Sequence, residues 1–177
     1  MLRIFDGVEG KILKARIYDA FKYWVYIPAA VVAGGKLADL MLELPPIPRH
    51  FLLTLAGMLL VFSGAVLIQR STKDLAVYGD GTPNPLRPPK RLVSEGSYGL
   101  CRHPMFFGYD LAALGVVLLF RSWGMLLVSY PVFLCLEYRF LRGEERLMEK
   151  RFGDSYIAYR SEVPLLVPFF RKRGRAV

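Results

Sequence analysis

The sequence predicts an all-α fold, a polytopic membrane helical bundle with about four transmembrane helices. Hydrophobic residues make up 54% of the 177 residues, and long runs without a formal charge account for this high fraction. Basic residues flank these runs, as in membrane proteins, so the net charge of +9 does not favour nucleic-acid binding. The connections are rich in proline and glycine, which end helices. We expect one membrane domain over residues 1–177.

The N-terminal part, residues 1–70, is expected to hold an interfacial helix and two transmembrane helices. Residues 1–22 are charged and mildly amphipathic, which is typical of a helix lying at the membrane surface. The first span is expected at about 23–44, where Lys36 and Asp39 either pair with each other or leave Lys36 to snorkel. The second span, residues 51–69, has no formal charge over nineteen residues.

The remainder, residues 71–177, is expected to be the catalytic, cofactor-binding part. A polar stretch from Arg70 to His103 is rich in proline and glycine, which predicts turns and extended backbone instead of a helix. Two further spans, residues 104–120 and about 123–138, form a helical hairpin, and the second continues as a charged helix to Arg151. A short capping tail follows.

Charge placement predicts the orientation of these helices. Five basic residues lie in the N-terminal region, six between the second and third spans, and ten in the C-terminal region, so 21 of the 24 fall on one side. The positive-inside rule assigns that side to the cytoplasm. We therefore expect four spans with both termini inside, and a five-span arrangement is less favoured.

Two polar clusters flank the hairpin, and they define the candidate site. Arg102, His103 and Pro104 precede one arm, whereas Glu144 and Glu145 follow the other. At 1.5 Å per residue, the clusters lie roughly 28 and 33 Å from the turn, so we expect them to meet at one depth. The helix start, the imidazole and the carboxylates suit a zwitterionic ligand that bears a sugar.

Simpler interpretations exist for each feature. An Arg-His pair at a membrane boundary can be an interface anchor, and the glutamates can belong to a solvated helix with i,i+3 and i,i+4 pairs. Asp110 lies inside an apolar span, where an ionisable residue suggests function, although a neighbouring hydroxyl could also satisfy it.

Three motifs in order resemble those of integral-membrane methyltransferases, the group that contains isoprenylcysteine carboxyl methyltransferases and phospholipid methyltransferases. Arg102-His-Pro-Met-Phe-Phe-Gly108 is similar to the RHPxYxG signature, Glu144-Glu145-x-x-Met148 to the EExxL motif, and Phe152-Gly-x-x-Tyr156-x-x-Tyr159 to the closing pattern. The resemblance covers about residues 79–168. It departs from the signature at Phe106, where a tyrosine is usual, and at Met148, where a leucine is usual.

The resemblance implies S-adenosyl-L-methionine as cofactor, bound at the cytoplasmic face. By position it implies these cofactor-binding residues: Gly96, Tyr98, Arg102, His103, Pro104, Phe106, Gly108, Glu144 and Glu145. No residue is assigned as a catalytic acid or base and no metal is expected, while Arg139 and Arg142 are candidates to orient the substrate.

The predicted function is methyl transfer to a lipophilic or membrane-embedded acceptor, either the carboxylate of an isoprenylcysteine-like molecule or a phospholipid amine. The alternative is an NADPH-dependent sterol-type membrane reductase, whose family shares a similar Arg-His-Pro hairpin but usually has longer chains. A non-catalytic membrane scaffold would leave the convergence of motifs unexplained. The expected partners are the membrane and a lipid-like substrate, without nucleic acid, and the oligomeric state is left open.

Overall fold

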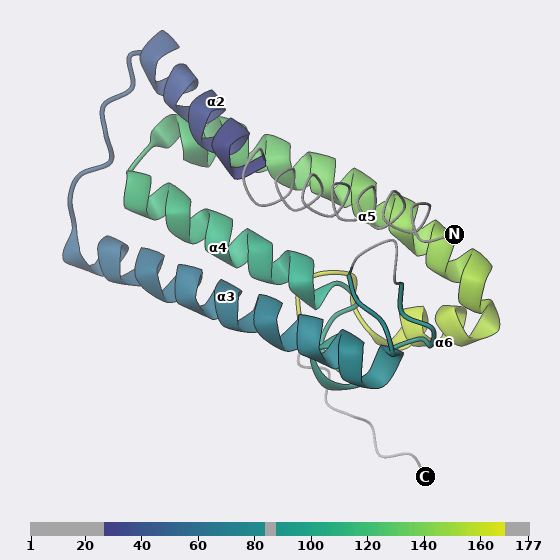
Figure 1. The fold of residues 1–177 in the computed structure, drawn as a ribbon. Helices are drawn as coiled ribbons and strands as arrows, with labels where there is room; N and C mark the ends of the chain where they lie inside the picture. The colour runs from purple at the N-terminus through teal and green to yellow at the C-terminus, as the bar shows by residue number, and fades with distance from the viewer. Residues whose placement is uncertain (1–26, 84–87, 169–177) are drawn as a thin grey trace, which may run out of the picture. The chain divides into compact units, whose positions relative to one another are not determined.

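The computed structural model describes residues 27–83 and 88–168, and its architecture is helical (Figure 1). In chain order the elements are α2 (Ile27–Met41), α3 (Phe51–Gly79), the 3-10 helix η2 (Gly96–Gly99), α4 (Pro104–Phe120), the π-helical turn η3 (Met125–Ser129), α5 (Tyr130–Phe152) and α6 (Asp154–Glu162). No strand occurs among the described residues, and the all-α prediction is confirmed. The predicted interfacial helix at 1–22 lies outside the described residues.

Helix α3 is long and apolar enough to cross a membrane. Its 29 residues rise about 43 Å, which exceeds the roughly 30 Å of a hydrocarbon core. Helix α4 is a shorter apolar helix of 17 residues. Large apolar side chains of α3 are exposed, namely Leu52, Leu55, Leu59, Phe62 and Val66. These features fit a membrane helical bundle, and the count of four spans stays a prediction.

The chain forms two compact units. One comprises residues 1–48 and 121–133, and the other comprises residues 49–120 and 134–177. The expectation of one membrane domain over the whole chain stays a prediction.

Asp39, near the end of α2, organises the first unit. Its carboxylate accepts hydrogen bonds from the Ser122 hydroxyl at 2.6 Å and the Gly124 amide at 2.7 Å, so it caps the backbone that leads into η3. Lys36 lies 3.6 Å from Asp39, which selects the pairing alternative over snorkelling. A Cβ on Gly35 would lie 2.6 Å from the Met125 Cα, so only glycine allows this close approach.

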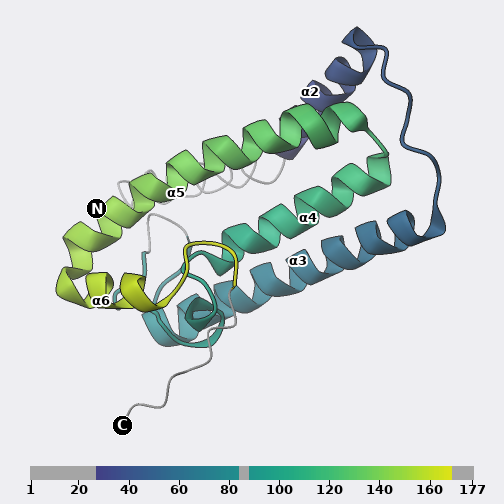
Figure 2. The ribbon, with the colours of Figure 1, turned by 180° about the vertical axis from the view of Figure 1, so that it is seen from behind.

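The second unit is built on the contact between α3 and α4, which run side by side in both views (Figures 1 and 2). Glycines from both helices form this contact. A Cβ on Gly64 would lie 2.8 Å from the Ala112 nitrogen, and one on Gly115 would lie 2.6 Å from the Gly57 carbonyl oxygen. Small residues bring helix backbones together in this way in membranes.

The prediction of a non-helical stretch from Arg70 was wrong over its first ten residues, because α3 continues to Gly79. No proline or glycine occurs between Arg70 and Tyr78, and Ser71 and Leu75 bury one face at i,i+4 spacing. The predicted end of this helix was placed where the apolar run stops. The helix instead ends at Gly79, because Asp80 follows in the left-handed conformation at φ 51°.

The predicted short capping tail also contains a helix, α6, which the sequence reasoning missed. Gly153, with φ 54°, separates α5 from α6. After α6, the tail runs back beside the start of α4: the Arg102 amide donates to the Pro164 carbonyl at 2.9 Å, and the His103 amide donates to the Leu165 carbonyl at 3.1 Å. The tail therefore fixes the backbone that enters α4.

Candidate active site

The two polar clusters predicted from the sequence meet in the second unit. Arg102 and His103 directly precede α4, and Glu144 and Glu145 lie on the charged half of α5. The Arg102 Nε lies 2.6 Å from a Glu145 carboxylate oxygen, and the His103 Nδ1 lies 3.7 Å from a Glu144 carboxylate oxygen. The hairpin prediction is therefore confirmed for both pairs, across about forty residues of sequence.

Arg102 and Glu145 form a buried ion pair that ties three segments together. Their side chains are 9% and 3% exposed. The Arg102 Nη1 also donates to the Val163 carbonyl at 2.6 Å and to the Arg160 carbonyl at 3.0 Å. The Tyr156 hydroxyl donates, at 3.1 Å, to the same Glu145 oxygen that accepts the hydrogen bond from the Arg102 Nε. Arg102 and the Glu145 Oε1 atom are thus engaged inside the protein, which indicates a positioning role. The buried Glu145 Oε2 has no hydrogen-bond partner among the described residues and lies 3.7 Å from the Arg142 guanidinium.

His103 and Glu144 have polar atoms left over for a ligand. Burial lowers the pKa of His103 to about 4, although the Glu145 carboxylate opposes this shift, so the imidazole is neutral at pH 7. Burial also raises the pKa of Glu144. Within the described part of the chain, the buried His103 Nε2 has no hydrogen-bond partner. A distance of 3.7 Å is too long for a direct hydrogen bond between the two side chains.

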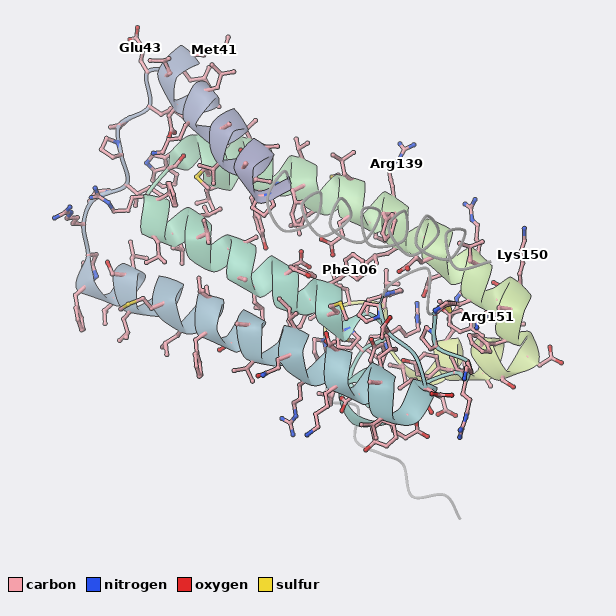
Figure 3. All side chains as sticks on the ribbon, viewed as in Figure 1. Met41, Glu43, Phe106, Arg139, Lys150 and Arg151 are labelled. Atoms are coloured by element: carbon pink, nitrogen blue, oxygen red, sulfur yellow. The ribbon has the colours of Figure 1, made fainter. Side chains whose placement is uncertain are left out.

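Aromatic rings adjoin this pair further along α4 and α5. The Phe106 ring centroid lies 6.0 Å from that of His103 in an edge-on arrangement and 5.7 Å from that of Phe140 on α5. Figure 3 shows Phe106 at the start of α4, on the side toward α5. The site therefore has a polar layer and an aromatic layer, and the aromatic faces can attract a cation.

The 3-10 helix η2 supplies one further side of the site. Asp74, on the extension of α3, accepts hydrogen bonds from the Ser97 amide at 2.8 Å and the Ser97 hydroxyl at 2.7 Å. Gly96 has φ 61°, and a Cβ there would lie 2.5 Å from an Asp74 oxygen, so the turn requires glycine. The Tyr159 hydroxyl donates to the Tyr98 carbonyl at 2.7 Å. Burial, followed by the Glu144 charge, raises the pKa of Tyr98.

Three predicted site residues lie away from the pair of His103 and Glu144. Gly108 lies at the α3–α4 contact, where a Cβ would be 2.8 Å from the Ile68 side chain, so helix packing explains this glycine. Figure 3 shows Arg139 on the side of α5 away from α4. Arg142 is half-exposed, with its guanidinium 3.7 Å from Glu145. Cofactor contact by Gly108 and substrate contact by Arg139 and Arg142 stay predictions.

The sequence reasoning did not single out Asp74, Phe140 or Glu137. Asp74 was assigned to a loop because the end of α3 was placed too early. Glu137 lies seven residues before Glu144, a spacing that places both on one face of a helix and could have identified it. Only tertiary contact identifies Phe140.

Comparisons with known proteins agree with this geometry. The model of the family described as Phospholipid methyltransferase matches residues 52–155, which contain the clusters on both arms of the hairpin. The chain therefore belongs to the phospholipid methyltransferase family.

Two curated relatives are each similar over less than half of this chain. The Protein-S-isoprenylcysteine O-methyltransferase of Schizosaccharomyces pombe is 36% identical over 81 residues, which are 44% of this chain and 33% of the relative. The Protein-S-isoprenylcysteine O-methyltransferase B of Arabidopsis thaliana is 30% identical over 83 residues, which are 45% of this chain and 40% of the relative. The similarity thus spans well under half of either relative.

Proposed function

We propose that the protein is an S-adenosylmethionine-dependent methyltransferase that acts on a lipophilic acceptor in a membrane. The observation that carries the proposal is the buried, unpartnered Nε2 of His103, with the Glu144 carboxylate 3.7 Å from the same imidazole and the Phe106 ring beside it, within the segment that the family model matches. Both relatives are named as methyltransferases of an isoprenylated cysteine, a lipid-modified group. A lipid acceptor also agrees with the exposed apolar surface of α3.

The residues present fit S-adenosylmethionine. The ligand has hydroxyl, amino and carboxylate groups for the free polar atoms of His103 and Glu144, and aromatic faces suit its positive charge. His103, Glu144, Phe106 and Tyr98 would hold it. When bound, the ligand supplies an electrophilic methyl group.

The remaining residues act by positioning and by excluding water. The ion pair of Arg102 and Glu145 holds the tail after α6 against the start of α4. Buried Tyr156 and Tyr159 close the same side. Transfer from a sulfonium is an in-line displacement, so alignment of the acceptor and exclusion of water supply much of the rate.

We also propose that this site and both termini face the cytoplasm. The basic residues described on the site side, including Arg142, Arg146 and Lys150 of α5, support this orientation through the positive-inside rule. The acceptor would then enter laterally from the membrane, whereas the donor would arrive from the water.

Binding of labelled S-adenosylhomocysteine to purified protein in lipid nanodiscs tests the proposal. We expect saturable binding that falls at least about tenfold in His103→Gln and in Glu144→Gln, because the first change displaces the hydrogen-bonding atom of the imidazole and the second removes the carboxylate charge. The matched controls, His50→Gln and Glu162→Gln, alter exposed residues outside the site and should bind as the wild type does. Saturable binding of NADPH without binding of S-adenosylhomocysteine would refute the proposal and favour a reductase.

A further inference from the structure

The part of α3 beyond its apolar run supports residues 88–99, which lead to α4. The Gly79 carbonyl, at the end of the helix, accepts a hydrogen bond from the Lys90 amide at 2.7 Å. A Cβ on Gly79 would lie 2.8 Å from the Val93 side chain, so this segment lies directly against the helix end. The helix α3 also contacts η2, and both belong to the second unit. The position of η2 therefore depends on the end of α3.

Asp74 is the residue of this helix end that holds η2. One oxygen of its carboxylate accepts both the Ser97 amide, at 2.8 Å, and the Ser97 hydroxyl, at 2.7 Å, across 23 residues of sequence. The first amides of a helix have no carbonyl partner inside that helix. Glu95, which precedes η2, forms no side-chain cap. Asp74 therefore caps η2 from another helix.

Packing alone gives η2 a weak hold. It comprises four residues, of which Ser97 is the buried one. Hydrogen bonds to a charged acceptor are about twice as strong as neutral ones, so the two bonds to Asp74 contribute much of what fixes η2. The contact between α3 and α4 has a separate basis, because glycines of both helices form it. Loss of Asp74 should therefore release η2 and leave the helix pair in place.

Tyr98 extends this arrangement into the candidate active site. It directly follows Ser97, and its carbonyl accepts the Tyr159 hydroxyl at 2.7 Å. Burial raises the pKa of Tyr98, and the charges of Glu144 and Asp74 raise it further, so the phenol keeps its proton at pH 7 and lies within electrostatic range of both carboxylates. A protonated hydroxyl in this place can donate to a ligand beside Glu144.

We infer that Asp74 is a positioning residue of the methyl-donor site: it fixes η2 through Ser97 and thereby sets where the Tyr98 side chain lies relative to Glu144. The inference rests on the proposed function and deepens it, because it assigns ligand affinity to a residue that acts through a neighbour. A binding site needs its groups within roughly 0.5 Å of their productive positions, and supporting hydrogen bonds supply that precision.

Binding of labelled S-adenosylhomocysteine to the full chain in phosphatidylcholine nanodiscs tests the inference. Asp74→Ala removes the acceptor of both Ser97 hydrogen bonds. We expect about 10- to 100-fold weaker binding, the factor for lost hydrogen bonds to a charged group.

Asp80→Asn is the matched control, because it removes a carboxylate next to the same helix end. Asp80 pairs with Lys90 at 2.7 Å, and the two side chains are 60% and 72% exposed, so the pair contributes little. Asparagine also tolerates the left-handed backbone at this position. This variant should bind S-adenosylhomocysteine as the wild type does.

A double-mutant cycle separates positioning through Tyr98 from a general structural role. Tyr98→Phe removes only the hydroxyl, and we expect about tenfold weaker binding. In the Tyr98→Phe background, Asp74→Ala should weaken binding by less than about threefold, because the group that it positions is already gone. A general structural defect would instead make the two effects additive.

Hydrogen exchange shows whether Asp74→Ala is folded. The Ser97 amide should exchange faster, whereas the amides of α4 should keep their wild-type protection. If the α4 amides lose protection, Ser97→Ala takes the place of Asp74→Ala under the same criteria. It removes the hydroxyl bond, leaves Asp74 intact and should weaken binding about threefold or more.

The outcomes separate this inference from the proposed function. Weaker binding that is coupled to Tyr98 supports the inference. Binding as tight as that of the wild type in a folded Asp74→Ala, or additive effects of Asp74→Ala and Tyr98→Phe, overturns the inference and leaves the methyltransferase proposal standing. Absence of S-adenosylhomocysteine binding in the wild type overturns the proposed function, and this inference with it.

Discussion

Replacing Arg102 by alanine should open the segment that closes the candidate active site. The Arg102 guanidinium contacts the Glu145 carboxylate at 2.6 Å and the carbonyl oxygens of Arg160 and Val163 at 3.0 and 2.6 Å. Because Glu145 is only 3% exposed at its side chain, Arg102→Ala leaves a buried carboxylate without its cation. Removing one partner of such a pair costs about 3–5 kcal/mol.

This loss should be local, so hydrogen exchange is the sharpest assay. The amides of Arg102 and His103 donate to the carbonyls of Pro164 and Leu165, and they exchange only when the tail leaves α4. A loss of about 3 kcal/mol raises the population of that open state by about two orders of magnitude. We therefore expect exchange at the His103 amide to accelerate about 100-fold or more in Arg102→Ala.

A matched control is available in the same tail. Arg160→Ala removes a surface pair with Glu149 at 3.2 Å, where both side chains are at least 40% exposed, and should cost less than about 1 kcal/mol. In a double-mutant cycle, Arg102→Ala and Glu145→Ala should be strongly non-additive, since the second change removes the stranded charge. If Arg102→Ala accelerates exchange no more than Arg160→Ala does, the ion pair does not hold the tail and the reasoning is wrong.

Three further predictions concern packing, titration and thiol reactivity. Gly64→Ala should destabilise the α3–α4 contact by about 1–3 kcal/mol, because the added Cβ would lie 2.8 Å from a backbone nitrogen. The control Gly143→Ala meets no atom within 4 Å and should be neutral or stabilising in thermal unfolding. Equal effects of the two changes would contradict the packing role of Gly64. The pKa of His103 is lowered from 6.5 to about 4 in the folded protein, so between these values the unfolded chain binds one more proton at this residue. The contribution of His103 to the free energy of unfolding is therefore complete above pH 6.5 and is lost as the pH falls toward 4. Denaturant titrations of the wild type and His103→Gln should differ in the pH dependence of this free energy over that window, and identical slopes would refute the prediction. Burial raises the pKa of the Cys101 thiol to about 12, so maleimide should reach Cys101 only after unfolding; native labelling of Cys101 would count against this burial.

The sequence by itself determined the helical class and the meeting of the two clusters. Apolar runs without charge define α3 and α4, because a membrane segment must satisfy its backbone within a helix. The arms of the hairpin on either side of the turn have similar lengths, so His103 and Glu144 were predicted at one depth without coordinates.

Only the tertiary structure decided which side chain of each cluster contacts the tail. Sequence treats Arg102 and His103 alike, and likewise Glu144 and Glu145. Adjacent helical residues point about 100° apart, so one glutamate turns toward the tail and the other toward His103. The tail engages Arg102 and the Glu145 Oε1 atom with carbonyl and hydroxyl partners that lie some sixty and eleven residues away, and no local pattern encodes those partners. In the two clusters, the buried polar atoms that stay without a hydrogen-bond partner among the described residues are His103 Nε2 and Glu145 Oε2.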